Sequence, residues 1–380
     1  LSRLGYEVVL LCARPRLPGR RREDGRDAPD GIPVRFLSPR PLPEWEDPLT
    51  TILRKASYLR PGECRHPFGW WLRFYAPEQR LPALLGDIGP SAVVLRSLFL
   101  QYLLVIRRVV SCPVVVDCHD DDVHLAWEMV RTVPLWRKAG PMANFVGVRR
   151  VVKSLLPLAD EVWTVSDEDA GRLRQFAGGR PVLTVPSGVD EGELAPSAAP
   201  GRDGICAVVG NFDYGPNLNG ARWFVSKVWG LVRRQLPSAE LWLVGSDAKD
   251  ALTELCESHP GVRALGRVPD LTPVYRDAGV MVVPLIEGGG TRLKVVEAWK
   301  NGKAVAGTTK GLEGLAAPPD AAAIADDPAR LANAIAALLR DVEARRVLGA
   351  RGLAFVSSRY AWRVIASALR DSSIVGRLQQ

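Results

Sequence analysis

The segment IEGGGTRLKVVE at residues 286–297 combines side-chain types that could bind a phosphate group. An apolar run at 280–285 predicts a buried strand before the glycines, and the pattern after them predicts a helix from about Thr291 to Lys300. Glycines let backbone N–H groups approach an anion, and the positive end of the helix dipole adds to the attraction. The residues that could share this work are Gly288, Gly289, Gly290, Thr291, Arg292, Lys294 and Glu297. Two cations beside a carboxylate predict a diphosphate that carries a hydroxyl-rich sugar.

The composition limits the class of protein. The chain has 380 residues, 47% of them hydrophobic and 24% charged, which indicates a globular protein with room for two domains of ordinary size. No apolar run reaches the length that a membrane-spanning helix needs. The six cysteines show no metal-ligand spacing, so we expect a cytoplasmic protein with reduced, buried thiols.

Positive charge is concentrated in the first part of the chain. The net charge is +8, and residues 51–110 hold nine cations and three acids. Such a field favours an anionic partner, which could be a nucleotide, a lipid headgroup or a nucleic acid. Aromatic residues at 67–75 (PFGWWLRFY) lie among these cations. They indicate either a packing segment or a patch that docks on an anionic membrane.

Strand and helix signals alternate along the chain, which predicts parallel sheets covered by helices. The alternation restarts after a Pro- and Gly-containing segment, so we expect an α/β fold of two doubly wound, Rossmann-like domains that face a central cleft. The expected boundaries are 1–192 for the first domain, 193–204 for a linker, 205–355 for the second domain and 356–380 for a C-terminal helix that returns to the first domain.

Six segments together resemble the retaining family 4 nucleotide-sugar glycosyltransferases, which have the two-domain fold known as GT-B. The segments are 159–173, 185–190, 208–224, 237–245, 261–285 and 288–315. The resemblance implies transfer of a sugar from a nucleoside diphosphate sugar to a hydroxyl acceptor with retention, in polysaccharide or glycoconjugate biosynthesis. It implies no cofactor, no metal, and a glycan or lipid-linked acceptor reached from the cytoplasm, with possible peripheral contact to the membrane.

The family begins with a strand and a glycine-rich loop that face the donor phosphates. This chain has no starting Met and opens with what reads as the end of a helix followed by a strand. We therefore expect the first strand and the glycine-rich loop of the first domain to be missing.

The resemblance also implies how the sugar nucleotide is held. Glu297 matches the second carboxylate of the family's E-x7-E motif, which binds the donor ribose. The first carboxylate would stand at Gly289, so we expect backbone amides of the glycine loop, with Glu287 as the alternative, to contact the donor sugar. Val268 lies where members of the family contact the nucleotide base, mostly through backbone groups.

The diphosphate cations also depart from the family pattern. Asn211 and Asn219 stand near the places where many members have an Arg and a Lys. We therefore expect Arg292 and Lys294 to neutralise the diphosphate, Arg292 through its planar guanidinium and Lys294 through a single ammonium charge.

In the first domain the segment VVVDCHDDD at 114–122 places His119 just after an apolar strand. The resemblance implies a histidine near the donor sugar at this place, with Asp120 and Asp121 as candidate acceptor contacts. A buried structural histidine is the alternative. The acidic run could also bind a metal ion, but no second carboxylate cluster accompanies it, so we expect none.

Three other functions remain open at this point. A nucleotide-sugar epimerase shares the two-domain plan and would isomerise the donor without an acceptor. A noncatalytic sugar-nucleotide or polysaccharide-binding protein would explain the missing first carboxylate. A nucleic-acid-binding protein is suggested by charge alone and would show a steep salt dependence; because no binding motif supports it, we expect no nucleic-acid partner.

Overall fold

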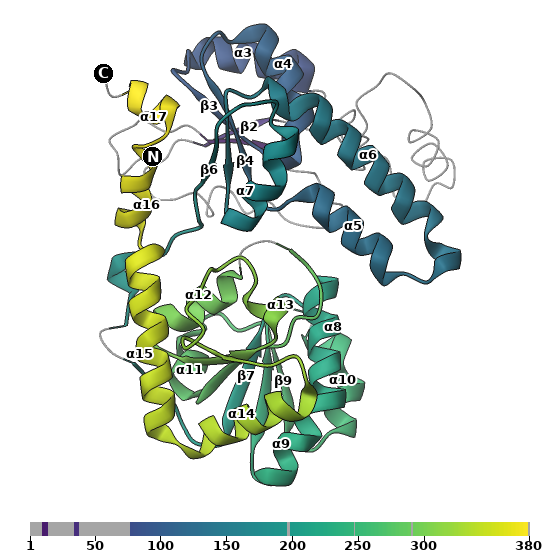
Figure 1. Cartoon of the computed structure of the whole chain (residues 1–380), viewed down its shortest axis with the longest axis vertical. Coiled ribbons are helices and arrows are strands. Elements are labelled where there is room, and N and C mark those ends of the chain that lie inside the picture. Colours follow the sequence, from purple (N-terminus) through teal and green to yellow (C-terminus); the bar gives the residue numbers. More distant parts are fainter. Residues whose placement is uncertain are drawn as a thin grey trace. The chain divides into compact units, whose positions relative to one another are not determined.

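The computed structural model describes residues 10–13, 34–37, 77–195, 198–246, 248–289 and 292–378. The chain divides into two compact units, Leu1–Thr184 with Ala368–Gln380 and Val185–Ser367. Each unit is built on a parallel sheet with helices packed against it (Figure 1), which confirms the predicted α/β class.

The main sheet of the first unit has four parallel strands in the order β3-β4-β5-β6. The strands are β3 (Val93–Arg96), β4 (Val114–Cys118), β5 (Glu161–Thr164) and β6 (Val182–Thr184); β1 (Leu10–Ala13) pairs in parallel with β2 (Val34–Leu37). The helices up to residue 176 are α3 (Pro77–Ile88), η2 (Ser97–Tyr102), α4 (Leu103–Val109), α5 (Asp122–Thr132), η3 (Leu135–Arg137), α6 (Ala139–Leu155), η4 (Leu156–Leu158), α7 (Asp167–Leu173) and η5 (Arg174–Phe176). Strands β4 and β5 are almost wholly buried, which suits the valine-rich sequence of β4 and the Val162 and Trp163 side chains of β5.

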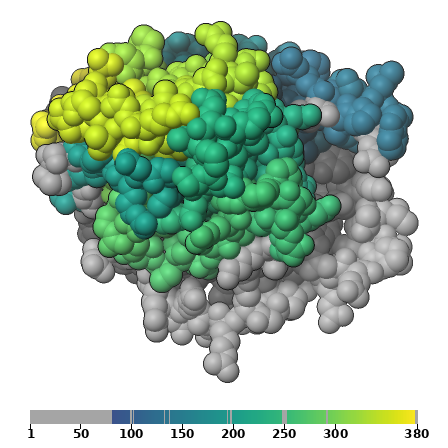
Figure 2. Space-filling view, turned by 90° about the horizontal axis from the view of Figure 1, so that it is seen from below, coloured from purple at the N-terminus to yellow at the C-terminus, as the bar shows by residue number. Residues whose placement is uncertain are grey.

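The second unit has six parallel strands in the order β12-β11-β10-β7-β8-β9. They are β7 (Ile205–Val209), β8 (Glu240–Val244), β9 (Val262–Gly266), β10 (Val280–Val283), β11 (Ala304–Gly307) and β12 (Ala323–Ile324). The helices are η6 (Glu191–Glu193), α8 (Gly215–Trp223), η7 (Phe224–Trp229), α9 (Gly230–Gln235), α10 (Ala248–Ser258), α11 (Thr272–Asp277), α12 (Leu293–Lys300), α13 (Thr309–Leu312), α14 (Pro328–Arg340) and α15 (Val342–Arg359). Helices α9 (teal) and α14 (yellow-green) lie side by side on the surface seen in Figure 2.

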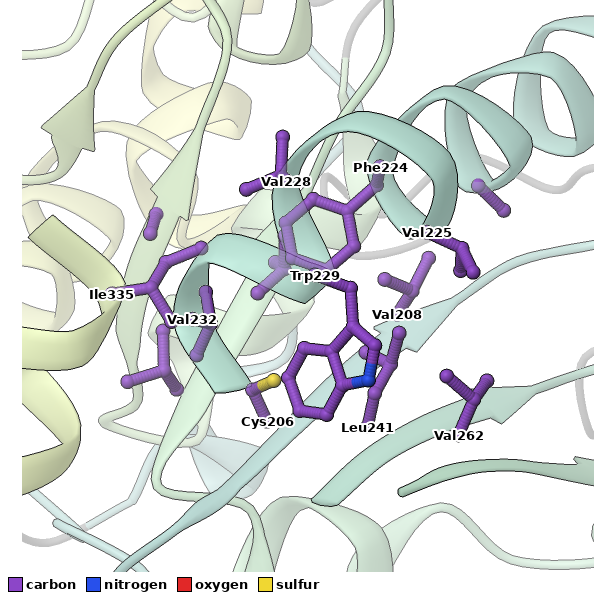
Figure 3. Packing of buried hydrophobic residues seen from close by; sticks show 14 of the residues in the cluster. Cys206, Val208, Phe224, Val225, Val228, Trp229, Val232, Leu241, Val262 and Ile335 are labelled. Carbon is purple, nitrogen blue, oxygen red and sulfur yellow. The ribbon is translucent and has the colours of Figure 1, made fainter. Parts of the chain in front are cut away.

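One core of the second unit lies between the sheet, the helical run from α8 to α9, and α14. Figure 3 shows Trp229 among side chains of β7 and β8, with Ile335 of α14 nearby. The indole Nε1 of Trp229 donates to the carbonyl oxygen of Pro260 at 3.0 Å, so this fully buried ring leaves no unpaired donor.

The segment expected to be a linker, 193–204, lies inside the second unit. The N–H of Ala195 donates to the carbonyl of Lys300 at 2.9 Å, and the N–H of Ala199 donates to Gly302 at 3.0 Å. These bonds tie its backbone to the loop after α12. The boundary between the units therefore precedes this segment and lies between Thr184 and Val185.

The C-terminal helix expected at 356–380 is divided into the end of α15, α16 (Trp362–Leu369) and α17 (Ser373–Leu378). The break after α15 has a clear cause. Val189 accepts a hydrogen bond from the N–H of Trp362 at 3.1 Å and donates to the carbonyl of Tyr360 at 2.8 Å, which forms a β-bridge. A continuous helix could not offer these backbone groups to Val189, because it would use them internally.

The first residue of β5, Glu161, holds the start of α17. Its buried carboxylate accepts from the hydroxyls of Ser372 and Ser373 at 2.6 and 2.8 Å, and from the N–H of Ser373 at 3.0 Å. It also accepts from the indole of Trp163 at 2.6 Å. A carboxylate remote in sequence thus satisfies the helix start, and residues 368–380 belong to the first unit.

Candidate functional site

Loops of the second unit begin at the carboxyl ends of its parallel strands, and in such sheets this edge binds ligands. The loops follow β7, β8, β9, β10 and β11, and α8, α12 and α13 lie at this end of the unit (Figure 1). The loops after β7 and β8 are joined directly. The N–H of Phe212 donates to the carbonyl of Ser246 at 3.1 Å, and the hydroxyl of Ser246 donates to the Asn211 side chain at 3.1 Å.

Two glycines allow the backbone segments at this edge to come together. Gly245 has φ +142°, and a Cβ there would lie 1.7 Å from the carbonyl oxygen of Gly210. A Cβ on Gly220 of α8 would lie 2.7 Å from the carbonyl oxygen of Pro284, just after β10. Any side chain would push these segments apart, so glycine is required at both places.

Lys294 is the cation at the centre of this edge. Its Nζ lies 2.5 Å from Oδ1 of Asn217, the third residue of α8, and a Cβ on Gly210 would lie 3.4 Å from the same Nζ. Burial, together with the charge of the nearby Arg292, lowers the pKa of Lys294 to about 8. A partly desolvated ammonium whose partner is a neutral amide would gain stability from an anion placed against it.

Arg292 turns toward its own loops. Its guanidinium donates to the carbonyls of Gly288, at 2.8 Å, and Gly289, and to the carbonyl of Lys310 at 3.0 Å; it also pairs with Glu313 at 3.3 Å. Arg292 is also the N-cap of α12, which begins at Leu293, close to the expected start at about Thr291. These contacts make Arg292 a brace of the glycine loop.

The brace has a consequence for the direction of the amides. A trans peptide places its C=O and N–H on opposite sides. Because the carbonyl of Gly288 points at Arg292, the N–H of Gly289 points away from the guanidinium. Arg292 thereby helps to present a backbone donor on the other side of the loop.

We expect Arg292→Lys to loosen this loop, because one ammonium cannot replace a planar fork that reaches several carbonyls. Hydrogen exchange of residues 286–289 should become faster, and the unfolding free energy should fall by about 1–3 kcal/mol as buried carbonyls lose their donors. Arg234→Lys, on the exposed end of α9, is the matched control. Unchanged exchange in the Arg292 variant would contradict the brace.

The carboxylates near the glycine loop have separate partners. Oε1 of Glu287 accepts from the side-chain amide of Asn219 at 2.6 Å, which joins the loop to α8. Glu297 pairs with Lys300 at 2.9 Å rather than with Lys294, and its side chain remains 43% exposed. The Glu297 carboxylate is therefore accessible to a ligand. Burial is the main cause of the raised pKa of Tyr275, and the negative charge of Glu297 is the second cause.

The remaining donor-side predictions lie at the same edge or outside the described residues. Asn211 accepts from the N–H of Asp213 at 3.1 Å, and Val268 is partly buried beside an apolar cluster in the loop after β9. Gly290 and Thr291 lie outside the described residues. Sequence reasoning missed Asn217, the direct partner of Lys294, although it stands two residues before Asn219 in the same short motif.

The predicted residues of the first unit follow β4. His119 is 41% exposed, and its Nε2 lies 2.9 Å from Oδ2 of Asp117. Asp121 is buried as the N-cap of α5 and accepts from two backbone N–H groups, while Arg172 lies 3.2 Å away. Burial raises the pKa of Asp121, and it raises the pKa of Asp122 to about 6 with help from Asp120. Capping is thus the observed use of Asp121.

The described residues form neither a candidate metal site nor a candidate membrane span. No group of three or more His, Cys, Asp or Glu side chains among them is arranged to hold a metal ion. No helix in the described part of the chain combines the length and apolar character needed to cross a membrane.

Known proteins resemble the chain in sequence and in structure. Residues 203–341 match the family model described as glycosyl transferases group 1. An uncharacterized 44.6 kDa protein in the cps region of Klebsiella pneumoniae is 23% identical over 170 residues, which cover 42% of this chain and 44% of that protein. The chain thus matches less than half the length of this relative.

Three solved structures extend the comparison to both units. Sucrose-phosphate synthase from Thermosynechococcus elongatus has a TM-score of 0.70 at 20% identity, covering 100% of this chain and 90% of that one. The α,α-trehalose 6-phosphate synthase of Burkholderia multivorans has 0.61 at 14%, covering 87% and 82%. Anabaena HepE in complex with UDP and glucose has 0.56 at 15%, covering 92% and 86%. Residues 203–341 are thus similar to the glycosyl transferases group 1 family, and the chain has the GT-B fold of the three solved structures.

Proposed function

We propose that the chain is a family 4 retaining glycosyltransferase that uses a nucleoside diphosphate sugar. The observation that carries the proposal is the partly desolvated Lys294, held by Asn217 beside the glycine loop at the carboxyl edge of a group 1 domain. The solved structure of HepE contains UDP and glucose, and one of TarM from S. aureus contains UDP, which supports this donor class.

In the proposed reaction the diphosphate is the leaving group, and its developing negative charge must be stabilised. The bond between the anomeric carbon and the diphosphate oxygen breaks, and its electron pair stays on that oxygen. The ammonium of Lys294 and the amide of Gly289 stabilise the resulting charge, while Arg292 keeps the loop in place. The acceptor oxygen bonds to the anomeric carbon from the same face, and its proton passes to the diphosphate oxygen.

The other predicted residues position the reactants. The exposed carboxylate of Glu297 accepts from the ribose hydroxyls, which fixes the reacting carbon. Glu287 or the loop amides contact the donor sugar, and the backbone around Val268 contacts the base. His119, oriented by Asp117, donates to a sugar hydroxyl, and Asp120 contacts the acceptor. The proposed reaction uses no metal ion.

The name of the sequence relative bears on the biological setting. The relative named after the cps region of Klebsiella pneumoniae supports polysaccharide or glycoconjugate biosynthesis. We place the reaction in the cytoplasm with a glycan or lipid-linked acceptor and with no nucleic-acid partner.

The test begins with a screen of UDP-, GDP-, ADP- and dTDP-sugars by thermal shift, because a ligand stabilises the folded state by mass action. The stabilising donor is then incubated with candidate acceptors. Release of nucleoside diphosphate with a product of unchanged anomeric configuration by NMR supports the proposal. An isomerised donor without acceptor would show an epimerase, and binding without turnover under every acceptor would show a binding protein.

Glu297→Ala tests the ribose contact. Loss of a carboxylate that accepts two hydroxyls should weaken donor binding by about ten- to a hundredfold, since hydrogen bonds to charged groups contribute about 1.5–3 kcal/mol. Glu254→Ala, an exposed carboxylate of α10, is the matched control. Equal donor affinity in the two variants would show that Glu297 does not bind the donor.

A further inference from the structure

Helices α5 and α6 form a hairpin that extends beyond the sheet of the first unit (Figure 1). Its inner side is anchored, because Val148, Val151 and Val152 of α6 are buried in the core of that unit. The rings of Trp127 and Phe145 pack at 5.1 Å between centroids and join the two helices. The hairpin is therefore a fixed part of the unit.

The turn of this hairpin exposes large apolar side chains. Leu135 is 83% exposed and Trp136 is 74% exposed, and both lie in η3 between the helices. Met142 and Val146, four residues apart on α6, are also exposed. Such a concentration of apolar surface at a projecting turn marks an interaction site rather than a tolerated single residue.

The charge of the hairpin turn and of α6 identifies the kind of partner. Residues 129–158 contain six cations and no Asp or Glu. On α6 the exposed face continues from Val146 to Arg149, Arg150 and Lys153, at the three- and four-residue spacing that places side chains on one side of a helix. A hollow of about 420 Å³ is lined by Phe145, Val146, Arg149, Arg150, Lys153 and Ser154. The apolar turn thus leads into α6, whose exposed face carries Arg149, Arg150 and Lys153.

We propose that the α5–α6 hairpin docks the protein on an anionic lipid membrane. Trp136 and Leu135 enter the interfacial layer, where an indole and an apolar chain are favoured, and Arg149, Arg150 and Lys153 meet lipid phosphates. The proposal is independent of the site in the second unit. It also differs from the membrane patch considered at 67–75, which lies outside the described residues.

The test measures binding of the full chain to vesicles by co-sedimentation. Vesicles that mix phosphatidylglycerol with phosphatidylcholine should bind the protein, vesicles of phosphatidylcholine alone should bind it much more weakly, and added salt should release it. The double variant Arg149→Glu and Arg150→Glu should lower the partition coefficient by at least about fivefold for each cation removed. Leu135→Glu with Trp136→Glu should remove binding even at low salt.

Matched controls separate docking from general effects. Val342→Glu and Arg330→Glu alter an exposed apolar residue and a cation on the second unit, and they should bind vesicles like the unaltered protein. Thermal unfolding of every variant checks that the fold is retained. Equal binding by the hairpin variants and the controls would overturn the proposal. So would concentration-dependent self-association without vesicles that the hairpin variants abolish, because the surface would then bind a second copy of the chain.

Discussion

Replacing Lys294 with Met is expected to lower the affinity for nucleoside diphosphate by about ten- to a hundredfold and to remove the pH dependence of binding. The magnitude follows from the loss of a partly buried charge-assisted contact, worth about 1.5–3 kcal/mol. The pKa of Lys294 is about 8 in the unliganded protein because of burial and of Arg292. A bound diphosphate favours the ammonium, so the pKa must rise on binding.

The sign of the pH effect follows from these two pKa values. Below about pH 8 Lys294 is already protonated, so its titration does not change the affinity for nucleoside diphosphate. Above pH 8 binding requires uptake of a proton, so affinity falls by up to about tenfold per pH unit until the pKa of the complex is reached. Titration calorimetry at pH 8.5 in buffers of different ionisation enthalpy should detect that proton.

Protein stability supplies an independent check on the same group. The pKa of Lys294 in the folded state lies below its ordinary value of 10.5, so the unfolded state binds more protons between about pH 8 and 10.5. Stability therefore rises with pH across that window, and the cost of the buried charge is present below it. Lys294→Met should reduce this rise in urea denaturation, although Lys303, whose pKa is also lowered to about 8 by burial, still contributes.

Lys227→Met is the control for both measurements, because Lys227 is an exposed residue of η7. It should bind nucleoside diphosphate and unfold like the unaltered protein. If the Lys294 variant kept normal affinity and the same proton uptake, Lys294 would have no place in the donor site.

Glu161→Ala is expected to release the C-terminal segment and to destabilise the first unit by about 3 kcal/mol or more. The substitution removes the acceptor of the Ser372 and Ser373 hydroxyls, the Ser373 N–H and the Trp163 indole. A buried donor left without a partner costs about 1–3 kcal/mol, and this loss exceeds the relief of removing one buried charge that is already well hydrogen-bonded.

Two measurements distinguish this local role from a general loss of protein stability. Hydrogen exchange in residues 373–378 should accelerate more than exchange in β4, and the melting temperature of the first unit should fall. Glu168→Ala, an exposed carboxylate of α7, should leave both unchanged. Protection of α17 in the Glu161 variant would show that apolar contacts alone hold the segment, since Ile374 and Val375 are also buried.

Much of the fold could be predicted because it rests on local patterns. Runs such as Val114–Cys118 and Val280–Val283 are short, apolar and β-branched, and helices lie between them, so a parallel α/β arrangement follows. The division of the C-terminal region could not be predicted in this way. It depends on Val189, which pairs with the chain about 170 residues later, and on Glu161, more than 200 residues from Ser372.

That glycines, cations and a carboxylate stand together after a buried strand can be seen in the sequence alone, because residues close along the chain remain close in space. How each of these residues is used depends on contacts made in the folded chain. Lys294 lies against Asn217, which is 77 residues away in the sequence. Arg292 donates hydrogen bonds to carbonyls of its own loop, and Asp121 caps helix α5. The physical reason is that desolvation and hydrogen-bond direction depend on neighbours brought by other strands. Those neighbours lie outside any local pattern.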